Sequence, residues 1–330
     1  MDTTTEKRPM VSVVMITYNQ AKEIATAIKG VVRQRADFDI ELIISDDAST
    51  DTTYSIAEEW QRRYPHIIKL YRNASNIGLQ ANYIKAFSYC RGRYMALCDG
   101  DDYWICRRKL AMQVGYMEQH PECAVTFHRM INFYESDRTM SLSNGGQSVL
   151  TDIRDLSRAN FITNASVLYR KDAVDLTGLP AWIRDIRLLD YAMHMLYAAN
   201  GTIRYFRRPM GVYRISGAGG TWSRAERYTQ LNMALKVREH LMKHFAHRPD
   251  ITEGLRNASV NILLHMAVAA EGDTEREDYV RNRLKKYPGY SDDAAIDAAV
   301  ARIASAPPRR KPFLSRLRAA ISRLIPLPRP

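Results

Sequence analysis

Residues 94–104 read YMALCDGDDYW, which is a short apolar run followed by three carboxylates in four positions and then by two aromatic residues. A nearly continuous apolar run of this length is typical of a parallel strand that is covered on both faces. The run ends abruptly at Asp99-Gly100-Asp101-Asp102. In open α/β sheets, ligands bind beyond the carboxyl ends of the strands. The stretch therefore predicts both a buried strand and the sheet edge at which a ligand binds.

The sequence before this strand repeats the same alternation. Three further apolar runs, at 11–17, 40–44 and 67–71, alternate with segments whose apolar residues recur at helical spacing. We expect those helices near 24–32, 52–64 and 79–90. Strand–helix alternation implies right-handed βαβ units, so the fold class is α/β with a mostly parallel sheet flanked by helices.

After residue 107 the pattern is looser. We expect helices at 110–119 and 190–199, strands at 124–134, 167–169 and 202–215, and a mostly helical region from 223 to about 302. The segment Glu135–Gly146 is polar and rich in turn residues, which predicts a mobile loop. The expected organisation is an α/β domain at 9–222, a helical region at 223–305 and a basic tail at 306–330.

Composition and charge narrow the class of protein. The chain has 330 residues, of which 46% are apolar, so it forms a core and is not disordered. The net charge is +12, but residues 301–330 carry eight positive charges, which leaves an ordinary +4 for the rest. Because the excess belongs to the tail, we do not expect nucleic-acid binding. No apolar run is long enough for a membrane span, and the polar start does not resemble a signal peptide.

The cysteines indicate a reducing compartment. Cys90, Cys98, Cys106 and Cys123 form no C-x-x-C pair, so we expect free thiols and a cytoplasmic protein. In that setting the four N-x-[ST] sequons are chance matches.

The acidic turn suggests a metal ion. Carboxylates this close repel one another unless a cation neutralises them, and a hard divalent ion with oxygen ligands does so while keeping positions open for phosphates. The alternative is a solvated acidic turn.

Two more polar clusters follow strands of the predicted sheet. In the first, Tyr18 and Asn19 are suited to stacking on a nucleotide base and to hydrogen bonding with it; in the second, Asp47 could accept a hydrogen bond from a base N–H. Neither glycine-rich phosphate motif follows the first strand.

Four motifs in order carry a family resemblance. VSVVMITYNQ, ELIISDDASTDTT, NIG (76–78) and ALCDGDDYW together resemble the inverting family 2 glycosyltransferases with the GT-A fold, over roughly 9–222. The resemblance implies a nucleotide-binding half at 9–104 and an acceptor and catalytic half at 105–222. It implies a divalent ion, Mg²⁺ or Mn²⁺, on Asp101 or Asp102. The nucleotide-sugar would be held by Thr17, Tyr18, Asn19, Asp47, Asn76, Asp99, Arg214 and Trp222.

An inverting transfer needs a carboxylate that takes the proton from the acceptor hydroxyl. By resemblance this base is Asp190, although relatives often carry Gly-Asp-Trp where this chain has Leu189-Asp190-Tyr191, and Asp185 is the rival. An ordinary first-turn acid is the structural alternative for Asp190. His194 lies one helical turn later, as a buried histidine or an additional metal ligand.

Three further features in the second half of the chain each allow two or more interpretations. Arg214 pairs with the diphosphate or with a surface acid. The loop at 217–222, which ends in Trp222, closes over the nucleotide or is an ordinary connector. Residues 312–325 have the pattern of a basic amphipathic helix, which favours an anionic membrane surface over docking on the domain or a disordered tail.

The expected function follows from these residues and the resemblance together. It is transfer of a sugar, with a UDP-sugar as the expected donor, to a glycan or lipid-linked glycan in cell-envelope polysaccharide synthesis. The expected location is cytoplasmic and peripheral on the inner face of the plasma membrane. The alternatives are a sugar-nucleotide nucleotidyltransferase, which should show a glycine-rich, arginine-containing first loop, and a non-catalytic basic binding protein.

Overall fold

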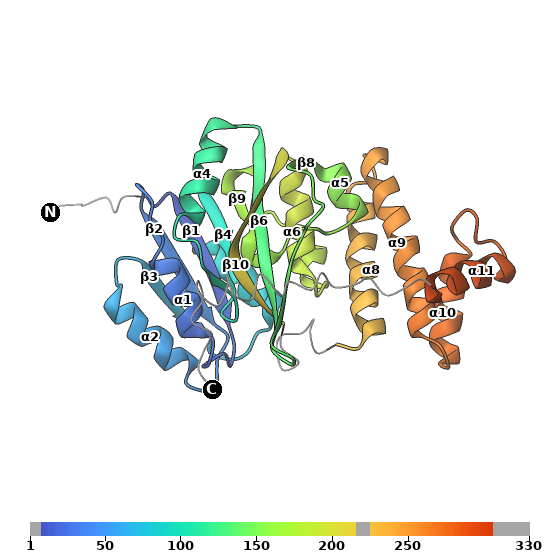
Figure 1. The fold of residues 1–330 in the computed structure, drawn as a ribbon, viewed down its shortest axis with the longest axis horizontal. Helices are drawn as coiled ribbons and strands as arrows, with labels where there is room; N and C mark the ends of the chain where they lie inside the picture. The colour runs from blue at the N-terminus through green and yellow to red at the C-terminus, as the bar shows by residue number, and fades with distance from the viewer. Residues whose placement is uncertain (1–7, 216–224, 306–330) are drawn as a thin grey trace.

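The first half of the chain forms parallel strands separated by helices (Figure 1). The computed structural model describes residues 8–215 and 225–305; Trp222 and the segment 312–325 lie outside these ranges. The strands are β1 (Val11–Thr17), β2 (Ile40–Asp46), β3 (Ile68–Arg72) and β4 (Tyr94–Leu97), and the helices between them are α1 (Ile24–Val32), α2 (Thr53–Arg63) and α3 (Leu79–Ser88). The strands lie side by side in the order β3-β2-β1-β4, all parallel, which confirms the predicted α/β alternation.

The second half extends this sheet with strands of both directions. β9 (Leu168–Arg170) runs antiparallel between β4 and β6 (Cys123–Tyr134), and β10 (Thr202–Ile215) runs parallel to β6. β5 (Tyr103–Trp104) pairs antiparallel with β10, so the acidic turn joins two different strands of the sheet. The parallel arrangement is therefore complete for β1–β4 and mixed beyond them.

The segment Glu135–Gly146 is not the loop that we expected. It contains β7 (Thr139–Leu142), which forms an antiparallel hairpin with β6. The register places Ile131 opposite Leu142 and Phe133 opposite Met140, so apolar cross-strand pairs stabilise a segment whose own composition favours turns. The short strand β8 (Leu150–Thr151) pairs with β10.

The core lies on both faces of the sheet. Side chains of β1 alternate between the faces, as the strand period requires: Val13 and Met15 pack with α1, whereas Val14 and Ile16 pack with α3 and α6 (Leu189–Ala198). The remaining elements of this part are α4 (Lys109–Gln119), α5 (Ile153–Arg158) and the 3₁₀ turns Asn164–Ser166, Lys171–Ala173 and Ala181–Arg184. The four cysteines are free, and three of them are buried.

The C-terminal helices form a layer beside the sheet domain. They are α8 (Arg227–His244), α9 (Pro249–Ala269), α10 (Thr274–Leu284) and α11 (Asp293–Ala304). Figure 1 shows α5 and α6 between the sheet and the pair α8–α9, with α10 and α11 farthest from the sheet. In the two described ranges, no helix is long and apolar enough to cross a membrane.

A lysine lies fully buried just after the acidic turn. Lys109 is 0% exposed, and its ammonium lies 3.7 Å from the centre of the Trp104 ring. The Nζ atom has no hydrogen-bond partner among the described residues. Burial lowers the pKa of Lys109 to about 7, because an ammonium without hydrogen bonds is poorly solvated there.

We therefore expect Lys109 to make stability depend on pH. The unfolded chain keeps the Lys109 proton up to its usual pKa of 10.5, whereas the folded chain loses it near 7. Between these values the unfolded state binds more protons, so the free energy of unfolding should rise with pH by up to about 1.4 kcal/mol per unit relative to Lys109→Met. Denaturant unfolding of both proteins from pH 7 to pH 10 measures this difference. Lys22→Met, at an exposed position, is the control; parallel curves for wild type and Lys109→Met would contradict the expectation.

Candidate active site

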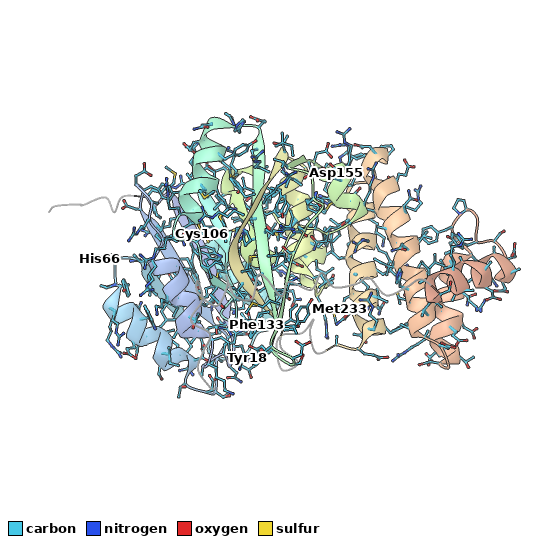
Figure 2. The ribbon with its side chains drawn as sticks, in the orientation of Figure 1. Tyr18, His66, Cys106, Phe133, Asp155 and Met233 are labelled. Carbon is cyan, nitrogen blue, oxygen red and sulfur yellow. The ribbon has the colours of Figure 1, made fainter. Side chains whose placement is uncertain are left out.

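A cavity of about 620 Å³ opens where β1, β2 and β4 end. It is lined by residues from distant parts of the chain, as the convergence of parallel strand ends requires. Tyr18 is labelled beyond the end of β1 in Figure 2. Nine predicted residues line the cavity: Thr17, Tyr18, Asp47, Asn76, Asp99, Asp101, Asp102, Asp190 and Arg214.

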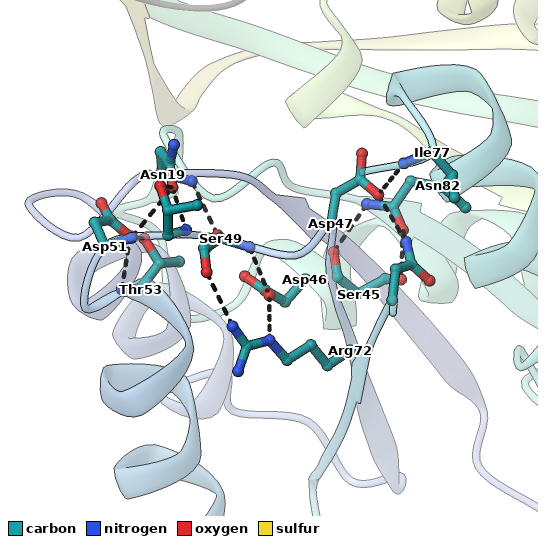
Figure 3. Close-up of polar contacts among 12 residues, drawn as sticks. Asn19, Ser45, Asp46, Asp47, Ser49, Asp51, Thr53, Arg72, Ile77 and Asn82 are labelled. Atoms are coloured by element: carbon teal, nitrogen blue, oxygen red, sulfur yellow. Dashed lines mark hydrogen bonds and ion pairs between the residues drawn. The ribbon is translucent and has the colours of Figure 1, made fainter. Parts of the chain in front are cut away.

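Asp47 holds the segment that follows β3 (Figure 3). One carboxylate oxygen accepts from Asn73 Nδ2 at 2.8 Å and from the Ile77 amide at 2.9 Å, and the other accepts from the Gly78 amide at 2.9 Å. Gly78 has φ +85° just before α3, a conformation that favours glycine. Asp47 thus fixes the NIG segment at the wall of the cavity.

Figure 3 also shows polar contacts among the residues beside Asp47. Asp46 Oδ2 accepts from the Ser49 amide at 3.0 Å and lies 3.5 Å from Arg72 Nε. Asn82 accepts from the Ser45 hydroxyl at 2.6 Å and donates to the Ser45 carbonyl at 3.0 Å. These bonds satisfy polar groups that would otherwise be costly to bury, and they fix the loop after β2.

Asn19 is a loop-positioning residue in this structure and does not line the cavity. Its side-chain Oδ1 accepts from the Thr50 backbone amide at 2.8 Å, and its backbone amide donates to Ser49 Oγ at 3.0 Å. Its φ of 53° lies in the left-handed region, which asparagine tolerates better than most residues. Asn19 therefore ties the loop after β1 to the loop after β2, and its contact with a nucleotide stays a prediction.

Two side chains that the sequence had not indicated as site residues hold Asp99 by hydrogen bonds. The Tyr83 hydroxyl donates to Asp99, and Asn164 Nδ2 donates both to Asp99 Oδ2 at 3.1 Å and to the Tyr83 oxygen at 2.7 Å. Burial, reinforced by Asp101, nevertheless raises the pKa of Asp99 to about 7. The only signal for Asn164 in the sequence was a sequon, which points to a different property.

Asp102 and Asp101 face different partners. Asp102 Oδ1 accepts from the Arg214 amide at 2.9 Å, and burial followed by the charges of Asp101 and Asp99 holds the Asp102 pKa well above its usual range. No other described side chain hydrogen-bonds to Asp101, whose pKa burial also raises. Asp101 is thus the carboxylate of the turn that is most available to a ligand.

Arg214 is the cation beside this cluster. Its side chain is 10% exposed, lies 3.6 Å from Glu135 and stacks 4.9 Å over the Tyr103 ring. The charge of Arg214 opposes the rise in the pKa of Asp101 and of Asp102. The predicted pairing with a diphosphate is compatible with this place on the wall, although the partner in the structure is an acid.

The residues present fit a hard divalent cation that a ligand helps to hold. Burial, followed by the charges of neighbouring acids, raises the pKa of all three carboxyl groups, so a cation at the turn would stabilise their ionised forms. Within residues 8–215 and 225–305, however, no three potential ligands converge on one point. A magnesium-like ion bound through one or two carboxylates, with phosphate and water completing its shell, suits that arrangement.

Asp190 also lies on the cavity wall, in the first turn of α6. Burial raises its pKa, which makes the ionised carboxylate a better proton acceptor. Asp185 is exposed at the end of a 3₁₀ turn and does not line the cavity, so the geometry favours Asp190 over its rival. Asn160, Thr163 and Arg187 share this wall, and no pattern in the sequence had indicated them.

His194 is a core residue. It is fully buried and bonded through Nδ1 to the Tyr169 hydroxyl, away from the residues that line the cavity. Burial lowers its pKa to about 3, so the ring is neutral. The possible role as a metal ligand is therefore not supported by its position, because the inward face of α6 carries His194 into the core.

Comparison with known proteins identifies relatives of the chain. The profile described as "Glycosyl transferase family 2" matches residues 12–177, half of the chain. The "Uncharacterized protein Rv1520" of Mycobacterium tuberculosis is 38% identical over 70% of this chain, and the match covers 65% of that relative, just under two thirds. The Escherichia coli "UDP-Glc:alpha-D-GlcNAc-diphosphoundecaprenol beta-1,3-glucosyltransferase WfgD" is 34% identical over 33% of this chain and 41% of its own length.

A solved structure has the same fold. Staphylococcus aureus TarS 1–349, in complex with UDP-GlcNAc, superposes with a TM-score of 0.60 at 17% identity. The superposition covers 88% of this chain and 83% of TarS 1–349. The likeness therefore extends beyond the profile match and includes the C-terminal helices, which confirms the predicted GT-A fold with a helical extension.

We expect Asp47→Asn to loosen the NIG segment without unfolding the protein. The carboxylate accepts from Ile77 and Gly78 through different oxygens, and the substitution replaces one of these oxygens by an NH2 donor, so one of the two backbone amides loses its acceptor. Hydrogen bonds to a charged group contribute about 1.5–3 kcal/mol, so hydrogen exchange at these amides should accelerate by roughly 10- to 100-fold. Asp51→Asn, which disturbs the neighbouring loop, is the control. Unchanged exchange at Ile77 and Gly78 in Asp47→Asn would show that Asp47 does not hold them.

Proposed function

Since the chain belongs to glycosyl transferase family 2, we propose that it transfers a sugar from a nucleoside diphosphate donor to a glycan or lipid-linked glycan. The anomeric centre is inverted in this reaction. The observation that carries the proposal is the single cavity that is lined by both the acidic turn and Asp190. The acidic turn suits a diphosphate with its cation, and Asp190 suits an acceptor hydroxyl.

The free acceptor capacity of Asp47 favours uracil as the base. A carboxylate has about four acceptor positions, and three of them bond Asn73, Ile77 and Gly78. One position remains on the side chain, which lines the cavity. Uracil offers a single imide N–H, whereas guanine presents two adjacent donors that need two acceptors. Tyr18 is 44% exposed on the same wall and can stack on the ring. These features support a UDP-sugar donor.

The acidic turn is the proposed site for the donor's diphosphate and a divalent cation. Asp101 would hold Mg²⁺ or Mn²⁺, with Asp99 or Asp102 as the second carboxylate. When bound, the ion supplies positive charge to the departing diphosphate. Arg214 lies on the same wall and adds a fixed positive charge that is already oriented before the reaction. Tyr83 and Asn164 keep Asp99 in place by hydrogen bonds.

Asp190 is the proposed base. Its carboxylate takes the proton from the acceptor hydroxyl while that oxygen attacks the anomeric carbon from the face opposite the diphosphate. The bond between the sugar and the diphosphate breaks, and the diphosphate leaves with the bonding electrons. Burial favours this step because it raises the pKa of Asp190 and so increases its affinity for the proton.

The cellular setting is part of the same proposal. The name of WfgD states that this relative uses a lipid diphosphate-linked acceptor, which supports cell-envelope polysaccharide synthesis for the present chain. Attachment of residues 312–325 to an anionic cytoplasmic membrane surface rests on their basic amphipathic pattern. A membrane-linked acceptor would be reached more readily from that surface.

Removal of the Asp101 carboxylate should abolish the effect of the metal ion on donor binding. In wild type we expect Mn²⁺ to increase the thermal stabilisation by UDP, since a ligand that binds the folded state raises stability by mass action. In Asp101→Ala this increase should disappear, and turnover should fall by roughly 10²-fold or more, as when one preorganised charge is lost. Asp278→Ala, at an exposed position on α10, is the control. Full activity of Asp101→Ala in excess chelator would rule out the metal role.

Asp190→Asn should affect chemistry and leave donor binding intact. The substitution preserves shape but removes the proton acceptor, so kcat should fall by roughly 10²- to 10⁴-fold while UDP affinity stays unchanged. Because the pKa of Asp190 is raised, the acid limb of the wild-type pH–rate profile should lie above the usual range of an aspartate. Asp185→Asn is the matched control. A loss in Asp185→Asn with normal rates in Asp190→Asn would assign the base to Asp185.

A further inference from the structure

A second pocket adjoins the active-site cavity on the side of Asp190. It has a volume of about 590 Å³ and lies between the end of α5, the start of α6 and the helices α8 and α9. Asn160 and Leu188 line both pockets, so the two pockets are neighbours that meet at these residues. Tyr191, the neighbour of the proposed base, forms part of the second wall. In Figure 1 this region is the junction of α5, α6, α8 and α9.

The polar side chains that line this pocket are arginines and asparagines, and no carboxylate lines it. These five residues are Arg158, Arg238, Asn160, Asn257 and Asn261. Guanidinium groups bind phosphate and carboxylate in a fork geometry, and amide side chains bond hydroxyls as donors and acceptors. This combination is suited to an anionic group that is flanked by hydroxyls.

Arg238 shows that the site is built into the fold. The residue is only 7% exposed, yet in the described part of the chain no carboxylate forms an ion pair with it. Its guanidinium stacks 4.6 Å over the Tyr191 ring, and Nη1 donates to the Ala234 carbonyl at 2.9 Å. Its Nε has no partner among the described residues. A buried cation with spare donors is costly, and an anionic ligand would remove that cost.

Close helix packing fixes the other side of the pocket. A Cβ at Gly254 of α9 would lie 2.0 Å from Ser157 Oγ of α5, so glycine is required where these helices meet. The Tyr191 hydroxyl donates to the Leu156 carbonyl at 3.1 Å, which joins α6 to α5. Asn257 and Asn261 are four residues apart on α9 and share a face. The wall is thus carried by packed helices and not by a loose loop.

We propose that this second pocket is an acceptor subsite for an anionic glycan, in which Arg158 and Arg238 bind a phosphate or carboxylate group of the acceptor. The asparagines bond the neighbouring hydroxyls, and the reacting hydroxyl extends past Asn160 and Leu188 to Asp190. The inference rests on the proposed function for its biological meaning. Binding of the anion itself does not depend on turnover and can be tested separately.

The test measures binding of small probes to the full chain. Glucose 1-phosphate, glucuronic acid and glucose are titrated by saturation-transfer NMR in chelator, with excess UDP to compete at the donor cavity. We expect at least one anionic sugar to bind, glucose to bind at least tenfold more weakly, and Arg158→Gln and Arg238→Gln each to weaken the anion tenfold or more. The two anionic probes distinguish a phosphate from a carboxylate source.

Controls separate this site from the donor cavity. Arg256→Gln, an exposed arginine of α9 that is not on the wall, and Asp101→Ala should both bind the probes as wild type does. Equal binding by wild type and Arg158→Gln would overturn the proposal even if Arg238→Gln failed to fold. Probe binding that depends on Arg158, in a protein without glycosyl transfer, would support this anion site and contradict the proposed function instead.

Discussion

Repulsion among buried carboxylates is the constraint around which this structure is arranged. Three neighbouring parallel strands end at one edge, and the turn after β4 adds three acids there. Each acid is held by a different means: Asp99 by Tyr83 and Asn164, Asp102 by the Arg214 backbone, and Asp101 by the position of the turn itself. A Cβ at Gly100, between these acids, would lie 2.4 Å from Gln20 Oε1, so a larger residue there would displace the Gln20 side chain. The fold thus keeps three carboxylates together at the edge of the sheet, with Arg214 as a neighbouring cation.

What could be predicted from the sequence was local. The strands and helices from β1 to α3 follow from hydrophobic periods within each segment, and the polar ends of β1, β2 and β4 follow from parallel topology. Contacts between distant segments could not be predicted. The β7 hairpin depends on apolar partners in β6, and Asn164 reaches Asp99 from 65 positions away. Likewise, no period in the sequence distinguishes His194, which faces the core, from Asp190, four residues earlier on the cavity wall.

The two pockets place the parts of the proposed reaction in order along the fold, from the sheet edge to the C-terminal helices. In this proposal the sheet edge supplies the donor wall, α6 supplies the base, and α8 and α9 supply part of the wall of the second pocket. Helix α6 is central to this order, because Asp190 faces the first pocket and Tyr191 faces the second. The Tyr191 hydroxyl fixes that helix to α5, so the base and both walls belong to one packed unit.

The two pockets also differ in how freely the sequences of their walls can change. Around the acidic turn, Asp99 and Asp102 are bonded to neighbouring groups, so a substitution of either residue disturbs the local structure as well as binding. Asn257 and Asn261 are exposed on α9, where replacements have little effect on stability. Evolution could therefore alter the acceptor preference through the surface of α9 while the donor chemistry stayed constant. One catalytic core could in this way diversify into enzymes that build different polymers.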